Sequence, residues 1–387
     1  MKEPRSMERT TMTLTEHLTN MGMSRSVDEI TPSAYAAAKK MLLDTLGCAL
    51  AGHREPGAGE SAAQMAEWGG KPEASILLHG ARVPAPNAAF ANSVMIHALD
   101  YDDVYIPAAA LHITSLIVPA MLAAAEMGEA TGREALAAMI MGMEVAGRLG
   151  IVERDYRRSG AFLPATIDGG FGAVVTAARL LGLTPDQCAD AMGINYAQTA
   201  GNRQALHDMT LTKRIQPALG VRSALWAVAL AGRGVSGPRR ALEGKSGFFK
   251  TYLNGEVPDA EAFTRPKDWF EVENTAIKRY TSCGACHHCQ EAAEILAREE
   301  KLRPEDIERV EIFPLCTEGG LVGKPFEMGR NPQVDAQFSV TYAVAFALLR
   351  GKPSIEDFTD EAVREHTDVA ELAQRIGFAE TPSDVPD

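Results

Sequence analysis

The chain has 387 residues, of which 46% are hydrophobic and 23% charged, as is typical of a soluble globular protein. Its net charge of −13 argues against nucleic acid or an anionic membrane surface as a partner, although a local cluster of Lys and Arg could still bind an anionic substrate. The N-terminus lacks the apolar stretch of a signal peptide, no run of about 18 uninterrupted apolar residues occurs, and cysteines are sparse. We therefore predict a cytoplasmic protein with reduced thiols and no membrane span.

Helical patterns dominate the chain from residue 31 to residue 233. Thr31-Pro32 is a cap residue followed by proline at a first helical position, and this helix should end near Gly52. Residues 75–83 form the main non-helical segment in this part of the chain, and their pattern predicts a small hairpin or an extended segment. The other helical patterns cover residues 57–68, 87–96, 116–125, 135–145, 166–181, 185 onward and 213–233. This part of the chain predicts an all-α domain.

The character of the sequence changes near residue 255. Residues 269–274 alternate apolar and acidic side chains, as a half-exposed strand does, and residues 307–313 predict a second strand. Helical patterns cover residues 284–298 and 337–349. We predict a mainly α protein: a large all-α domain over residues 1–260, joined by the C-terminal helix, and a smaller α+β domain over residues 261–387.

The stretch from His97 to Asp103 places one imidazole and three carboxylates, including Asp100, within seven residues. His112 follows nine residues later, just before another apolar run. Acids and imidazoles at the ends of apolar helices are common where proton transfer occurs. The alternative is that Asp102 and Asp103 are solvated charges or cap the next turn. Spacing alone does not decide between the two interpretations.

Lys213 and Arg214 lie in the first turn of a predicted helix, where cations oppose the helix dipole. Such a placement favours a bound anion, which Arg203 and His207 just upstream could also face. The alternative is that both cations simply reach solvent.

Cys283, Cys286 and Cys289 follow Lys278 and form two overlapping C-x₂-C units, with His287 and His288 between the last two. This spacing is compatible with zinc or an iron–sulfur cluster. Against a metal, no second C-x₂-C unit occurs elsewhere, and the sequence also fits a helix N-terminus with an activated or packed cysteine.

Taken together, these stretches resemble the MmgE/PrpD family, which includes 2-methylcitrate dehydratases, cis-aconitate decarboxylases and iminodisuccinate epimerases. The matching stretches are residues 43–48, 87–103, 173–183, 212–217, 278–283 and 337–342. The resemblance implies a helical large domain, an α+β lid domain that is shortened here at its C-terminus, and a homodimer. It also implies an active site between the domains that uses neither nucleotide nor metal.

The resemblance carries over residue by residue. It implies active-site roles for Asp100, His112, Lys213, Lys278 and, as a looser match, Tyr342, which by pattern alone is a core residue. Cys283 stands where many members have Cys and the decarboxylases have His. One departure is Leu163, because many members have His at this position. The loss of that imidazole puts the usual dehydration or decarboxylation in doubt, and His207 could supply a different proton relay.

We therefore predict a cofactor-independent lyase or isomerase that removes a proton α to a carboxylate of a small di- or tricarboxylate. Dehydration, decarboxylation and epimerisation are the three possible outcomes. Lys213, Lys278 and Arg203 would bind substrate carboxylates, and His112 and Asp100 would be the base and its orienting partner, in either order. The alternatives are a Cys/His-ligated zinc or iron–sulfur hydro-lyase and a catalytically degenerate family member. The sequence does not name the substrate.

Overall fold

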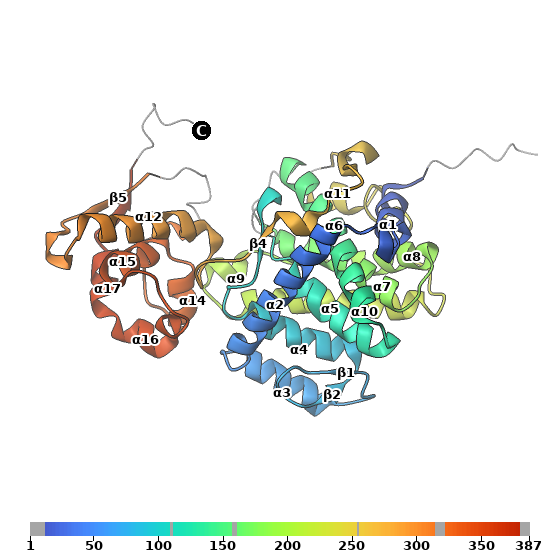
Figure 1. Cartoon of the computed structure of the whole chain (residues 1–387), viewed down its shortest axis with the longest axis horizontal. Helices are drawn as coiled ribbons and strands as arrows, with labels where there is room; N and C mark the ends of the chain where they lie inside the picture. Colours follow the sequence, from blue (N-terminus) through green and yellow to red (C-terminus); the bar gives the residue numbers. More distant parts are fainter. Residues whose placement is uncertain (1–11, 109–110, 157–160, 254, 314–321, 380–387) are drawn as a thin grey trace, which may run out of the picture.

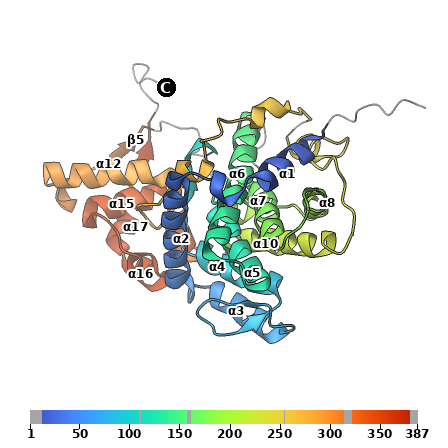
Figure 2. The ribbon, with the colours of Figure 1, turned by 45° about the vertical axis from the view of Figure 1, so that its right-hand side comes forward.

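The computed structural model describes residues 12–108, 111–156, 161–253, 255–313 and 322–379 (Figure 1). The protein is mainly α, as predicted, and the helices form a large and a small group. The large group contains α1 (Leu14–Ser24), α2 (Pro32–Gly52), α3 (Ala58–Trp68), α4 (Ala85–His97), α5 (Thr114–Gly128), α6 (Gly132–Tyr156), α7 (Pro164–Leu180), α8 (Pro185–Tyr196), α9 (Gln204–His207), α10 (Thr212–Ala231) and α11 (Phe248–Tyr252). The small group contains α12 (Gly284–Glu300), α14 (Pro332–Gln337), α15 (Val340–Arg350), α16 (Asp360–Glu365) and α17 (Thr367–Ala373). Figures 1 and 2 both show the small group at one end of the molecule.

Local capping explains why several helices begin where the sequence predicts. The Ala34 amide donates to the Thr31 hydroxyl at 3.2 Å, and Pro32 occupies the first position of α2. At α8 the Gln187 amide donates to the Thr184 hydroxyl at 3.2 Å, while the Thr184 amide donates to the Gln187 side chain at 3.0 Å. In each cap the paired residues are three positions apart in sequence, so the hydrogen bonds do not depend on how the rest of the chain packs.

The core of the large group is built on close helix packing. A Cβ added at Gly172 of α7 would lie 2.5 Å from the Gly142 carbonyl oxygen of α6, so only glycine permits this approach. By length and composition alone, the Gly132–Arg154 part of α6 could cross a membrane. However, 83% of its apolar window is buried inside the protein, as in the core helix of a globular domain.

Three two-stranded pairs are present within the described residues: β1 (Ala74–Ser75) with β2 (Arg82–Val83), β3 (Val104–Tyr105) with β4 (Thr275–Ala276), and β5 (Val310–Ile312) with β6 (Ile376–Phe378). The first pair is the predicted hairpin, and β5 lies within the predicted strand at residues 307–313. The antiparallel β3–β4 pair joins the loop after α4 to the segment that leads into the small group. This pair brings residues near 100 and near 278 together.

The strand predicted at residues 269–274 is wrong, because Glu271–Asn274 forms a 3-10 turn. The alternation has another cause: Glu271 is buried, its amide donates to Glu144 at 2.8 Å, and its carboxylate accepts the Tyr105 hydroxyl at 2.6 Å. Phe270 and Val272 belong to the large-group core. This part of the predicted smaller domain therefore packs with the large one.

The small group has a hydrophobic core of its own, centred on α12, α15 and α17. The predicted helix over 337–349 is divided, because the Ser339 side chain caps α15 by accepting the Tyr342 amide at 3.2 Å. We expected a C-terminal helix to join the large domain. Instead, α15 and α17 pack in the core of the small group.

Candidate active site

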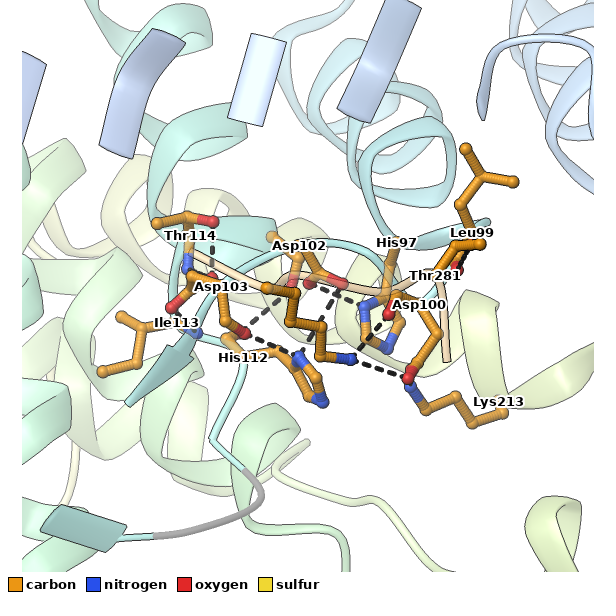
Figure 3. Close-up of polar contacts among 12 residues, drawn as sticks. His97, Leu99, Asp100, Asp102, Asp103, His112, Ile113, Thr114, Lys213 and Thr281 are labelled. Atoms are coloured by element: carbon orange, nitrogen blue, oxygen red, sulfur yellow. Dashed lines mark hydrogen bonds and ion pairs between the residues drawn. The ribbon is translucent and has the colours of Figure 1, made fainter. Parts of the chain in front are cut away.

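Charged side chains from four separate segments meet where the two groups of helices adjoin (Figure 3). His97 is the last residue of α4, and three aspartates follow it in the loop. His112 precedes α5, Lys213 lies in the first turn of α10, and Lys278 follows β4. We call these residues the acid–lysine cluster: His97, Asp100, Asp102, Asp103, His112, Lys213 and Lys278.

Asp100 is the meeting point of the two lysines. The Lys213 ammonium donates to one carboxylate oxygen of Asp100, and the Lys278 ammonium donates to the other at 2.7 Å. Only 7% of the Lys213 side chain and 1% of the Lys278 side chain are exposed. Burial alone would raise the pKa of Asp100, but the two ammonium groups outweigh burial and hold this pKa well below its usual value. The carboxylate is therefore ionised at neutral pH.

The backbone at Asp100 is held in a conformation that non-glycine residues rarely adopt, with φ of +50°. Lys278 also donates to the Asp100 carbonyl oxygen at 2.6 Å. The preceding carbonyl, that of Leu99, accepts the Thr281 hydroxyl at 2.9 Å and the Gln337 amide at 2.8 Å. These contacts come from the segment after β4 and from α14, so both groups of helices fix the backbone that carries Asp100.

Asp102 lies between the two imidazoles. Its Oδ2 lies 2.7 Å from His97 Nδ1, and its Oδ1 lies 3.7 Å from His112 Nδ1 without a hydrogen bond among the described residues. Burial opposes ionisation of Asp102, but the two imidazoles and the Lys278 ammonium lower its pKa well below the usual range. Burial in turn lowers the pKa of His97, although Asp102 counteracts part of this effect.

Asp103 fixes the position of His112. Its carboxylate accepts the amides of Ile113 and Thr114 at 3.2 and 2.9 Å and the Thr114 hydroxyl at 2.6 Å, at the start of α5. Its carbonyl oxygen lies 2.8 Å from His112 Nδ1. Since a carbonyl only accepts, Nδ1 carries the proton and Nε2 keeps its lone pair. Figure 3 shows the second ring nitrogen of His112 pointing away from Asp102 and Asp103.

His112 is neutral at physiological pH. Burial lowers the pKa of this imidazole to about 3, and the Lys278 and Lys213 ammonium groups add to that effect while Asp102 opposes it. The side chain is 12% exposed, more than either lysine. The cluster thus presents a neutral base and an ammonium group beside an ionised carboxylate.

The structure brings Asp100, His112, Lys213 and Lys278 together and places Cys283 beside them. Cys283 occupies the position just before α12, and burial raises the pKa of its thiol, with Asp100 adding to the effect and Lys278 opposing it. His97 and Asp102 contribute as much to the geometry; the sequence singled out the stretch that contains them but assigned catalytic roles only to Asp100 within it and to His112. The sequence feature that could have identified both residues is their placement, because His97 ends α4 and Asp102 follows five residues later in the same loop as Asp100.

Four predicted site residues lie elsewhere. Tyr342 is fully buried among aromatic rings of the small group, and its hydroxyl lies 3.1 Å from His366 Nδ1. Arg214 donates to the Pro56 carbonyl at 2.8 Å and to Gln333 at 3.1 Å, because the side chain next to Lys213 on a helix points to a different face. Arg203 is partly exposed and His207 exposed, and within the described structure no hydrogen bond or ion pair joins either side chain to the acid–lysine cluster.

For the cysteine metal site, which the sequence left as an alternative, the described part of the chain brings no three cysteine or histidine ligand atoms of residues 283–289 close enough to share an ion. Cys283, Cys286 and Cys289 form no disulfide within the described residues, and Cys286 is buried in the small-group core. One group of three His, Cys, Asp or Glu ligands in the described residues has its atoms within 4.8 Å of one another, and it consists of His97, Asp102 and His112.

Comparisons with known proteins agree with this arrangement of domains. The MmgE/PrpD N-terminal domain matches residues 16–261, and the MmgE/PrpD C-terminal domain matches residues 280–384. A cis-aconitate decarboxylase-like protein of Aspergillus oryzae is 30% identical over 70% of this chain and 60% of its own length. A cis-aconitate decarboxylase of Aspergillus terreus is 28% identical over 96% of this chain and 78% of its own length. A 2-methylcitrate dehydratase of Salmonella typhi is 27% identical over 90% of this chain and 74% of its own length.

By name, these relatives are decarboxylases or decarboxylase-like proteins and a dehydratase, and the two family domains together match most of this chain. The chain belongs to the MmgE/PrpD family of enzymes.

Proposed function

We propose that this protein is a cofactor-independent lyase or isomerase that removes the proton α to a carboxylate of a small di- or tricarboxylate. The observation that carries the proposal is the neutral imidazole of His112, whose unprotonated Nε2 points away from Asp102 and Asp103 in a cluster that also holds a lysine ammonium. A base beside a cation is the minimum needed to remove a proton that is acidified by a carboxyl group.

The two lysines have different parts in this proposal. An ammonium group has three N–H donors, and Lys278 directs its donors to the Asp100 carbonyl, the Asp100 carboxylate and the Ser282 carbonyl at 3.1 Å. Among the described residues, Lys213 has one hydrogen-bond acceptor, a carboxylate oxygen of Asp100. Lys213 therefore retains donors for a substrate carboxylate, whereas Lys278 positions Asp100.

The proton transfer follows from this arrangement. Lys213 binds the substrate carboxylate, and His112 Nε2 takes the α-proton as the C–H electron pair moves into the carboxylate to give an enediolate. Negative charge on the substrate raises the pKa of His112, which strengthens the base only when the site is filled. Asp102 then faces a protonated imidazole and stabilises it. Reprotonation on the opposite face gives an epimer, and loss of a β-hydroxyl gives an alkene.

Decarboxylation would use the same site with a different bond broken. Loss of CO₂ leaves a carbanion that must be protonated, and a cation such as Lys213 would stabilise it. The names of the relatives, cis-aconitate decarboxylase and 2-methylcitrate dehydratase, support both lyase outcomes. Leu163 is buried at the start of α7. Because its side chain is a hydrocarbon, this position supplies no acid or base for either reaction.

Proton NMR in D₂O with the purified protein tests the proposal. The panel contains tartrate, citrate-type hydroxy acids, cis-aconitate and iminodisuccinate. Deuterium at an α-position without loss of the substrate supports an epimerase, new vinyl signals support a dehydratase, and release of CO₂ supports a decarboxylase. If none of these compounds exchanges or reacts, the proposal fails.

A second candidate is a metal-dependent enzyme, favoured by the grouping of His97, Asp102 and His112 and by Asp102 Oδ1, which has no hydrogen bond in the described structure. The neighbouring Lys213 and Lys278 ammonium groups would repel a divalent cation, which is why we prefer the first candidate. The two candidates differ in their response to chelation. Exchange that is lost in EDTA and restored by Zn²⁺ would establish the metal enzyme.

We also propose that the enzyme is a cytoplasmic homodimer without a nucleic-acid or membrane partner. The support is the negative net charge and the resemblance to the family. Light scattering after size-exclusion chromatography gives the mass in solution, and a monomer would contradict the dimer.

A further inference from the structure

The outward face of α10 is apolar. Leu219, Trp226 and Leu230 are 40%, 56% and 40% exposed, and Ile215 is partly exposed. Because successive residues of a helix point about 100° apart, these four side chains lie within a sector of about 60°. We call them the α10 stripe: Ile215, Leu219, Trp226 and Leu230.

The α10 stripe lacks the charges that a surface helix carries on its outer face. α3 has such charges, since Glu60 and Glu67 are exposed on it. The 20 residues of α10 include no Asp or Glu, and Arg222 is its one cation that is not buried. The Arg222 guanidinium carbon lies 5.5 Å from the centre of the Phe90 ring on α4. An exposed apolar stripe without charges is typical of a surface that another protein covers.

The two ends of the α10 stripe carry opposite charges. Asp208 is exposed in the turn before α10 and lines the same surface hollow as Leu219. Arg233 is exposed two residues after α10 ends, and it directs one of its five N–H donors to the Ala229 carbonyl at 2.9 Å. If two copies of the stripe pack antiparallel, Asp208 of each copy lies near Arg233 of the other. The stripe is therefore complementary to itself in charge.

α2 exposes a second apolar set, which consists of Leu43, Leu46 and Leu50. The ends of this set carry charges of the same sign, because Lys39 and Lys40 are exposed at one end and Arg54 just beyond the other. Antiparallel packing of two α2 helices would bring these cations together, which is unfavourable. Tryptophan is also over-represented among the residues that contribute most to binding, and α2 contains none. These differences favour α10 over α2 as the contact between two copies.

We propose that a second copy of this chain covers the α10 stripe, with the two α10 helices packed antiparallel about a two-fold axis near residues 219–222. The proposal rests on the homodimer proposed above and identifies its contact face. Because a two-fold axis makes each contact occur twice, Trp226 of each copy packs on Ile215 of the other, and both ends gain a pair between Asp208 and Arg233.

Light scattering after size-exclusion chromatography, on a dilution series of the full-length protein, measures the dissociation constant of the dimer. We expect Trp226→Glu to raise this constant about 100-fold, because it removes a large apolar anchor and buries a charge at two symmetric places. Since Trp226 is more than half exposed in the single chain, the helical circular dichroism should stay unchanged. Leu43→Glu is the matched control. It places the same charge on the exposed face of α2 and should leave the constant unchanged.

Charge reversal at the ends of the α10 stripe tests the antiparallel orientation. Asp208→Arg and Arg233→Asp should each raise the dissociation constant about three- to tenfold, because each variant replaces two attractive pairs by two repulsive ones. The double variant should restore the wild-type constant, since the pairs form again with their signs exchanged. This series decides the proposal by itself if Trp226→Glu does not fold.

The possible failures can be told apart. A wild type that is monomeric at every concentration would contradict the homodimer and, with it, the α10 contact. A dimer that persists in Trp226→Glu, or that dissociates in Leu43→Glu instead, would keep the homodimer but overturn the α10 contact. Single charge variants that are not rescued by the double variant would overturn the antiparallel arrangement. None of these masses depends on whether the protein exchanges an α-proton, so the reaction and the contact face are tested separately.

Discussion

Lys278 binds both the backbone carbonyl and the carboxylate of Asp100, at 2.6 and 2.7 Å. One buried side chain thus holds the left-handed backbone of Asp100 and the orientation of its carboxylate together. Lys213 contacts the same carboxylate from α10 but takes no part in holding the backbone. This difference predicts that the two lysines, both buried and both paired with Asp100, will respond differently to mutation.

Replacement of Lys213 by Met should reduce kcat/KM by about 10²–10³-fold, because a cation that stabilises the enediolate is lost. The fold should be nearly as stable as the wild type, since Lys278 still neutralises Asp100. Deuterium exchange measures the first effect and urea unfolding the second. Wild-type turnover in Lys213→Met would rule out the role that we propose for this lysine.

Replacement of Lys278 by Met should reduce both activity and stability. The mutation leaves the buried carbonyl oxygens of Asp100 and Ser282 without the ammonium that they accept from, and each buried acceptor left without a hydrogen bond costs about 1–3 kcal/mol. The urea midpoint should fall well below that of Lys213→Met. Equal midpoints for the two variants would contradict the positioning role of Lys278.

His112→Gln should abolish α-proton exchange, with a loss of about 10²–10⁴-fold in rate, because glutamine cannot take the proton. His207→Gln is the matched control, since His207 is exposed and no hydrogen bond or ion pair joins it to the cluster among the described residues. We expect wild-type exchange in that variant. Loss of exchange in His207→Gln with retention in His112→Gln would instead favour the relay through His207 that the sequence suggested.

The sequence predicts best where the interacting groups are neighbours in the chain. The caps at Thr31 and Thr184 fall in this class, and so does the grouping of His97, Asp102 and His112 at the facing ends of α4 and α5. The convergence of Lys213 and Lys278 on Asp100 is different. It depends on how α10 and the β3–β4 pair pack, so only the family resemblance pointed to it.

The incorrect predictions also arise where the interacting groups are far apart in the chain. The apolar–acidic alternation at residues 269–274 suggested a strand, but Glu271 is acidic and buried because Tyr105 and Glu144 form its partners across the fold. Arg214 was grouped with Lys213 because they are adjacent, yet adjacent positions on a helix point about 100° apart. In both cases the side-chain partner lies far away in sequence, and the local pattern contains no information about it.

Tyr342→Phe tests whether this tyrosine is catalytic. Its hydroxyl bonds to His366 inside the small-group core, so the variant should keep wild-type exchange and lose about 0.5–1.5 kcal/mol of unfolding free energy. Urea unfolding and exchange in D₂O measure the two effects. A large loss of exchange with an unchanged midpoint would restore the catalytic role that the resemblance implied.

Asp44 of α2 gives the protein a pH-dependent stability. Burial, with the nearby charge of Asp102, raises the pKa of Asp44 to about 6, and its Oδ2 is buried without a partner in the described structure. Because the folded protein holds this proton more tightly than the unfolded chain does, its stabilising effect is complete below about pH 4. The effect is lost as the pH rises through 6, where the carboxylate becomes charged.

Asp44→Asn stays neutral at every pH, so it should be more stable than the wild type at pH 8 by about 1 kcal/mol, a value reduced to allow for partial exposure. At pH 4, close to the pKa of an aspartate in the unfolded chain, the difference should nearly vanish. Glu67→Gln on the exposed face of α3 is the control and should show no such difference at either pH. Urea unfolding of the three proteins at both pH values measures these differences. If Asp44→Asn is less stable than the wild type at pH 8, the Asp44 carboxylate makes a favourable interaction in its charged form, and its pKa is not raised.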